Sequence, residues 1–358
     1  MRTKWLFGRK IDIGLLLVPV WFCWLIAFLL PESILGSEIP LWVWVSVVVG
    51  IDVSHVWSSI HRTYLDREEF TNHKKLLVLA PILSFALSFG IAFISIDLFW
   101  RCLAYVAVYH FVKQQYGFMR IYKAKAGDFR KKLIGDNFII YLSMLYPIVF
   151  WHISPNREFV WFVQGDFITF IQSDQLSSWL HVTSWLYIIV LLYWLLEELI
   201  QGKRNELNIQ WPKILWVLTT AGNWYLGIVF FNSDLVFTIT NVVAHGVPYM
   251  VLVIFYQTKK NRLRRRKNTS FVKMTGLVIG SVLVLAIIEE YFWDMMVYRD
   301  NVDFFSSLLP YLSQPPSFTI QLLFIGVLAV PQITHYILDG FIWKNNDKNP
   351  FLKKTILE

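Results

Sequence analysis

Four histidines in long apolar stretches carry the main chemical signal of this sequence: His55, His110, His245 and His335. Asp52 precedes His55 by three residues, and Asp339 follows His335 by four. At these spacings a helix places the carboxylate and the imidazole on the same face. Neutral imidazole is a ligand for zinc, copper, iron and nickel, and a ligating histidine usually donates its other N–H to a carboxylate or carbonyl. These residues therefore predict a transition-metal site.

The expected ligands are the four histidines and Asp339. Carboxylate oxygens beside imidazoles favour iron over a metal held by thiolates, and the two cysteines, Cys23 and Cys102, are interpreted as small apolar residues. Two alternatives stay open. Haem could be bound by a single pair of facing imidazoles. His61 lies about 120° around the helix from His55, and it is either a further ligand or an interfacial residue.

Other polar residues share the faces of these histidines and are expected to position substrate or transfer protons. They are Asp52, Lys113, Gln114, Asn241 and Tyr249. An ionisable group costs about 2.5–3.5 kcal/mol at the centre of a membrane helix, so it is expected to face the interior of a helical bundle. The acidic residues at the ends of two apolar stretches are interpreted instead as solvated helix ends; they are Glu197, Glu198, Glu289, Glu290 and Asp294.

The stretches that position these residues are long enough to cross a membrane, because about 20 apolar residues span about 30 Å of hydrocarbon. We predict ten spans, approximately at residues 12–30, 40–61, 76–97, 98–118, 137–154, 178–199, 212–231, 234–257, 273–292 and 318–341. Of the 358 residues, 56% are hydrophobic and 16% are charged, whereas soluble proteins have about 25% charged residues. The composition predicts an all-α, polytopic membrane bundle. It excludes a soluble enzyme, a disordered chain and a disulfide-stapled secreted domain.

Lysine and arginine indicate the orientation, since 29 of these 33 residues lie in the N-terminal segment, in alternate connections and in the C-terminal tail. Positive charge marks the cytoplasmic side of a membrane, so both termini are expected in the cytoplasm. The expected organisation is one transmembrane domain (1–343) and a basic cytoplasmic tail (344–358), in a bacterial inner membrane. The basic loops are interpreted as topological charge against anionic head groups, with no nucleic-acid partner. The segments 155–177 and 293–317 then cap the outer ends of the spans or re-enter the membrane.

With this orientation the four histidines lie at similar depths, towards the cytoplasmic leaflet. The resulting prediction is a membrane-embedded, iron-dependent oxygenase or oxidoreductase. Its substrate would be a lipid, a fatty acyl chain or an isoprenoid that enters from that leaflet, and a redox partner would supply electrons. Two alternatives use the same residues. A proton- or ion-coupled transporter would use the histidines and aspartates as a relay, and a lipid-modifying transferase would use a histidine as its base.

The general plan is similar to that of the bacterial and archaeal β-carotene-cleaving membrane dioxygenases, which have many spans, a comparable size and single iron-binding histidines on separate helices. The resemblance covers the architecture and implies iron. It extends to no local motif around the histidines, which stand in the segments YHFVKQQYG (109–117), NVVAH (241–245) and THYILDG (334–340). The HxxxH and HxxHH boxes of membrane desaturases are absent from the sequence.

Overall fold

The computed structural model describes residues 4–36, 39–154, 160–168, 174–204, 208–264 and 270–358, and within these ranges every regular element is a helix. Seven helices of the described chain are long and apolar enough to cross a membrane: Arg9–Leu29, Leu41–Arg62, Lys74–Ile94, Ser178–Arg204, Asp234–Leu263, Phe271–Tyr298 and Phe318–Ile342. This confirms the all-helical prediction and is the pattern of a multi-pass membrane protein. Residues 155–159 and 169–173 of the expected outer cap lie outside the described residues.

The three other predicted spans also coincide with helices. They are α8 (Ile96–Ala126), α9 (Asp136–Ile153), and α11 (Trp211–Trp224) with its π-helical continuation η3 (Tyr225–Phe230). These helices are more polar than the seven; α8, for example, carries Arg101 and Lys113 within its length. The count of ten spans and the orientation of the chain therefore stay predictions.

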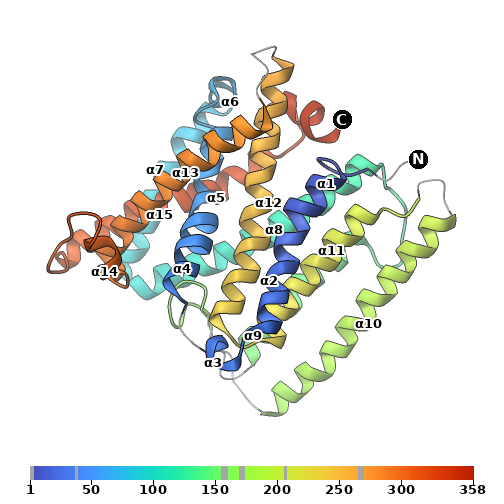
Figure 1. Ribbon diagram of the computed structural model, residues 1–358, viewed down its shortest axis with the longest axis horizontal. Helices are drawn as coiled ribbons and strands as arrows, with labels where there is room; N and C mark the ends of the chain where they lie inside the picture. Colours follow the sequence, from blue (N-terminus) through green and yellow to red (C-terminus); the bar gives the residue numbers. More distant parts are fainter. Residues whose placement is uncertain (1–3, 37–38, 155–159, 169–173, 205–207, 265–269) are drawn as a thin grey trace. The chain divides into compact units, whose positions relative to one another are not determined.

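The chain divides into two compact units, and each unit combines segments that are distant in the sequence. Unit 1 comprises Met1–Val47, Ala107–Val251 and Ile356–Glu358. Besides α9, α11 and η3 it contains α1 (Arg9–Ile11), η1 (Asp12–Leu17), α2 (Val18–Leu29), α3 (Glu32–Leu35), α4 (Leu41–Val43) and α10 (Asp174–Arg204). In this unit α11 packs against α2 and α9, and α9 packs against α10 (Figure 1).

One buried carboxylate, that of Asp12, holds the N-terminal segment in unit 1. Asp12 accepts hydrogen bonds from the backbone N–H groups of Leu6 and Phe7, at 2.6 and 2.8 Å, and from the hydroxyl of Tyr122, at 3.1 Å. A buried carboxylate is costly unless such donors surround it. The donors come from the N-terminal segment and from α8, so Asp12 ties the start of the chain to that helix.

Unit 2 comprises Val48–Val106 and Leu252–Thr355. It contains α5 (Ser54–Arg62), α6 (Arg67–Asn72), α7 (Lys74–Ile94), α13 (Phe271–Trp293), η4 (Asp294–Tyr298), α14 (Val302–Ser306), α15 (Phe318–Ile342) and α16 (Pro350–Leu352). The helices η2 (Trp44–Val53), α8 and α12 (Asp234–Leu263), and the short C-terminal η5 (Lys353–Leu357), contain the boundaries between the two units.

The longest packing contact in unit 2 joins α7 and α15 (Figure 1). Gly326 makes it close, because a Cβ atom at this position would lie only 2.9 Å from the Cβ atom of Phe89. Further along the same contact, the hydroxyls of Ser84 and Thr334 lie 3.2 Å apart and share a hydrogen bond. Small residues at membrane helix contacts let the backbones approach closely, and this contact positions α15 and therefore His335.

The segment expected as a basic tail packs against unit 2 through Asn349, which is buried. The Asn349 amide donates to the carbonyls of Phe341 and Lys344, at 3.0 and 2.8 Å. It thereby satisfies backbone acceptors at the C-terminal end of α15, which a helix cannot satisfy internally. Its Oδ1 atom accepts from the guanidinium of Arg62 at 3.1 Å, so the tail is also joined to α5.

Candidate metal-binding site

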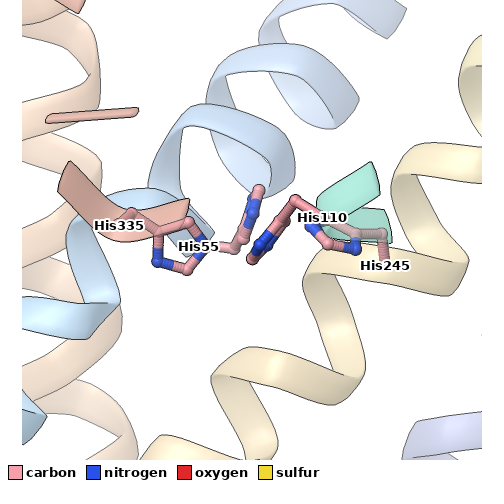
Figure 2. Close-up of side chains that lie close together, drawn as sticks. All are labelled: His55, His110, His245 and His335. Carbon is pink, nitrogen blue, oxygen red and sulfur yellow. The ribbon is translucent and has the colours of Figure 1, made fainter. Parts of the chain in front are cut away.

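Two of the predicted ligands, His55 and His335, face each other inside unit 2 (Figure 2). They come from α5 and α15, and both are buried. Their ring centroids are 5.1 Å apart and their planes are inclined by 81°. One ring nitrogen of His55 lies within 4.8 Å of a ring nitrogen of His335. This pair could supply two imidazole ligands to one metal ion.

A carboxylate stands beside each histidine of this pair. Asp52 Oδ1 lies 3.4 Å from Nδ1 of His55, and Asp339 Oδ2 lies 3.8 Å from Nε2 of His335. Asp52 belongs to the π-helical segment η2, which runs directly into α5. π-Helical turns are rare and often mark functional sites. At 3.4 Å, Asp52 can orient the imidazole of His55, and at 3.8 Å, Asp339 is close enough to approach as a ligand beside His335.

The other two predicted ligands, His110 and His245, face each other inside unit 1 (Figure 2). They come from α8 and α12, and both are buried. The centroids of their rings are 5.1 Å apart at an inclination of 80°, and one ring nitrogen of each lies within 4.8 Å of one from the other. The ring of His245 also stacks on Phe111, with 3.6 Å between centroids and 8° between planes. The stacking fixes the plane of that imidazole.

Two glutamines of α8 hold the backbone of α12 next to His245. Gln114 Nε2 donates to the carbonyl of His245 at 2.7 Å, and Gln115 Nε2 donates to the carbonyl of Ala244 at 3.0 Å. Pro248 explains the second bond, because a proline has no N–H to donate to the carbonyl four residues earlier. Sequence reasoning identified Gln114 but missed Gln115. The signal was the spacing between Ala244 and Pro248, which leaves one carbonyl without its helical donor.

The remaining predicted residues of α12, Asn241 and Tyr249, lie one turn on either side of His245 and are buried. Asn241 Nδ2 donates to the carbonyl of Phe237 at 3.1 Å, and its Oδ1 accepts from Asn223 at 3.5 Å. Asn241 thus belongs to a network of amides in unit 1. The bond from Asn223 joins α11 to α12.

Lys113 was expected to share a buried face with His110, but its side chain lies on the surface of unit 1. His110 itself, one turn earlier on α8, is buried. Three tyrosines surround the ammonium group of Lys113. His61, which the sequence left open as a ligand, bonds to Ser281 of α13 through Nε2 at 2.8 Å.

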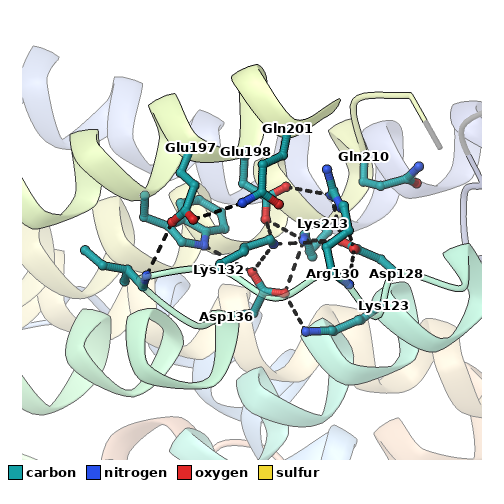
Figure 3. A network of polar contacts seen from close by, with 12 residues as sticks. Lys123, Asp128, Arg130, Lys132, Asp136, Glu197, Glu198, Gln201, Gln210 and Lys213 are labelled. Atoms are coloured by element: carbon teal, nitrogen blue, oxygen red, sulfur yellow. Dashed lines mark hydrogen bonds and ion pairs between the residues drawn. The ribbon is translucent and has the colours of Figure 1, made fainter. Parts of the chain in front are cut away.

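A group of three carboxylates in unit 1 also has the spacing of a metal site (Figure 3). Oxygens of Asp128, Asp136 and Glu198 lie within 4.8 Å of one another. However, the ammonium of Lys213 is 2.6, 3.2 and 2.6 Å from these three side chains. The ammonium of Lys132 contacts the same carboxylates. The chain therefore supplies its own cations at this position, and the group is an internal ion-pair network.

The buried position of Glu198 corrects the prediction that it is a solvated helix end. The prediction was wrong because the loop that carries Asp128, Arg130 and Lys132 packs over the end of α10, and a sequence does not reveal that contact. Burial alone would raise the pKa of Asp128. Hydrogen bonds from Arg130 and Lys213, and the charge of Lys213, outweigh burial and hold the pKa of Asp128 well below its usual range.

The same prediction was wrong for two acidic residues of unit 2, Glu289 and Asp294, which are buried. The indole N–H of Trp57 donates to Glu289 at 2.5 Å. Asp294 accepts from the hydroxyl of Tyr311 at 2.7 Å and from the backbone N–H of Asn301 at 2.6 Å. The segment after α13 supplies these last two donors, so it covers the end of the helix.

Comparisons with protein-family models, with curated proteins and with solved structures found no match to this chain. The functional argument therefore rests on the site itself. Within the described residues, each unit contains one pair of buried, facing histidines that could hold a metal ion.

Proposed function

We propose that this protein is a membrane-embedded metalloenzyme and that His55, His335, His110 and His245 together hold its metal ion. The observation that carries the proposal is the occurrence of two facing pairs of buried imidazoles on apolar helices, each with 5.1 Å between ring centroids. Burying polar groups among apolar helices is costly, and metal coordination is one way to offset that cost. The use of all four histidines by one ion follows from the similar depths that the sequence assigns to them.

The donor set favours iron. It combines neutral imidazoles with two nearby carboxylates, Asp52 and Asp339, and such mixed nitrogen and oxygen donors suit non-haem iron. A bound iron would supply redox chemistry with dioxygen, which the side chains of this chain do not supply. Asp52 orients His55, and Gln114 and Gln115 hold the backbone that carries His245. We propose an oxygenase or oxidoreductase that acts on a lipid, fatty acyl or isoprenoid substrate and takes electrons from a redox partner.

Metal analysis tests the proposal directly. We expect protein purified in a neutral detergent to retain a transition metal in near-stoichiometric amount, and His335→Ala and His245→Ala to lose it. His181→Ala is the matched control, because His181 is exposed on α10, and it should retain the metal. A preparation without transition metal, or a metal content that is the same in all three variants, would exclude the metalloenzyme.

The number of ions distinguishes one shared site from two separate ones. With one shared ion, the double variant His55→Ala/His335→Ala loses all metal although His110 and His245 are intact. With two separate sites, the unmodified protein binds two ions and the double variant keeps one. The second result would refute the four-histidine site while leaving metal binding in place.

A proton-coupled transporter is the second candidate, and the carboxylates beside His55 and His335 favour it. Exchange of protons between imidazole and carboxylate needs no metal. This candidate predicts a metal-free protein whose reconstitution into liposomes couples proton movement to solute uptake, and whose uptake is lost in Asp52→Asn.

A further inference from the structure

The ammonium group of Lys113 is exposed on unit 1 inside a cluster of tyrosines. It lies 6.0 Å from the ring centroid of Tyr109, 5.0 Å from that of Tyr116 and 5.9 Å from that of Tyr141. It also donates a hydrogen bond to the hydroxyl of Tyr141 at 3.2 Å. The rings of Tyr116 and Tyr141 stack, with 5.1 Å between their centroids. The cluster is therefore built by both α8 and α9.

The charge of Lys113 has no acidic partner in the part of the chain that the structure describes. Lys123, further along α8, does have such a partner, since it lies 2.8 Å from Asp136. Tyrosine faces attract a cation. They stabilise the charge without neutralising it. An ammonium has three donors, and Tyr141 takes one, so two remain for an anion.

The surface beside the cluster is apolar. Phe138, Leu145 and Val149 are all exposed on α9. They recur with Tyr141 at spacings of three to four residues, so they form one stripe along the helix. A hydrocarbon chain suits such a stripe, and an anionic group suits the ammonium at its edge. An amphiphile with both parts matches this surface better than a free anion or a neutral lipid.

We propose that Lys113, Tyr109, Tyr116 and Tyr141 bind the anionic head group of a lipid whose acyl chain lies along the exposed stripe of α9. The recognised chemistry is an anionic oxygen, carried by either a carboxylate or a phosphate. The site does not depend on the metal, so it goes beyond the proposed function.

Binding of defined amphiphiles to the purified full-length protein tests this site. Native mass spectrometry in a neutral detergent would measure the occupancy of oleate, of phosphatidylglycerol and of zwitterionic phosphatidylcholine at matched concentrations. We expect an anionic amphiphile to bind in preference to phosphatidylcholine. Preference for oleate would identify a carboxylate head group, and preference for phosphatidylglycerol would identify a phosphate. Equal occupancy by all three would overturn the proposal.

Four variants locate the site. Lys113→Met keeps the apolar stem and removes the charge, and we expect it to weaken anionic binding about tenfold. Lys113→Arg keeps the charge and should retain binding. Tyr116→Leu should weaken binding, because it removes one ring of the cluster. Arg120→Gln is the matched control, since Arg120 is an exposed cation two turns further along α8, and it should leave binding unchanged.

Equal effects of Lys113→Met and Arg120→Gln would indicate general attraction of anions to a basic surface, and that result would contradict a tyrosine-built site. Because Lys113 is exposed, none of its variants removes a buried contact. Unchanged thermal unfolding of Lys113→Met would confirm that any loss of binding reflects the site.

Discussion

At the scale of single residues, Lys213 has a large expected effect on stability. It is buried and lies within 3.2 Å of three carboxylates. We predict that Lys213→Met destabilises the protein by about 3–5 kcal/mol, because it leaves buried negative charge without its main partner. Thermal unfolding in detergent would measure the change. Lys203→Met is the control, since Lys203 is exposed and exposed ion pairs contribute about 0–1 kcal/mol. Equal unfolding temperatures for both variants would contradict the prediction.

The carboxylate of Asp128 makes the same network sensitive to acid. Its pKa in the folded protein lies below the value of about 3.9 expected in the unfolded chain. The stability it contributes is therefore present above pH of about 4 and is lost as the pH falls towards the folded pKa. We predict that the unfolding temperature falls steeply below a pH of about 4 and that Asp128→Asn has a lower but flatter profile. Parallel profiles for the two proteins would refute the assignment.

Gln115 shows how far residue types alone can identify a site. The histidines were found from the sequence because ionisable groups are rare in apolar stretches. Gln115 was missed because its role depends on a carbonyl that Pro248 leaves free on another helix. The same limit applies to Lys113, whose exposure depends on how α8 rotates against its neighbours.

We predict that Gln115→Met lowers stability by about 1–3 kcal/mol, because the buried carbonyl of Ala244 and the hydroxyl of Thr220 both lose a partner. If this bond also holds His245 in position, metal content should fall with stability. Gln201→Met, on the partly exposed end of α10, should change neither quantity. Full metal retention in Gln115→Met would show that His245 is positioned by other contacts.

At the scale of helices, the contact between α7 and α15 is one that a single added atom can disturb. A Cβ atom at Gly326 would lie 2.9 Å from Phe89 and 3.1 Å from Phe85. We predict that Gly326→Val separates the two helices, lowers the unfolding temperature and reduces metal content, because α15 carries His335. Gly280→Val is the control, since a Cβ atom there meets nothing within 4 Å. Metal content that is unchanged in Gly326→Val would show that the position of His335 does not depend on this contact.

The lengths of the apolar stretches predicted the helices well, since each predicted span coincides with a helix. The sequence did not predict how the ends of these helices pack. Glu198 and Glu289 stand at the ends of apolar runs, as solvated residues do, but segments distant in the sequence bury them. The C-terminal tail is basic, yet Asn349 attaches it to α15 and to Arg62. Such contacts are set by tertiary structure, which hydropathy does not encode.

At the scale of the whole molecule, the positive charge has two roles. The excess of lysine and arginine on one side predicts the orientation. Each unit, however, uses part of that charge internally: Lys213 serves Asp128, Asp136 and Glu198 in unit 1, and Lys260 bonds Asp66 and Glu69 in unit 2, at 2.8 and 2.5 Å. Fewer cations are therefore available to anionic head groups than the sequence count suggests.

The orientation itself is testable because exposed residues are available on both predicted sides. Lys203 lies in a connection predicted to be cytoplasmic, and Ser307 lies in a segment predicted to be outside; both are exposed. We predict that a membrane-impermeant maleimide labels S307C in intact bacterial cells and labels K203C only after permeabilisation. The background should be low, because Cys23 is buried and Cys102 is partly buried. The reverse pattern would place the basic side outside, contrary to the charge rule. It would also move the histidines to the outer leaflet, and the proposed substrate would then have to enter from that leaflet.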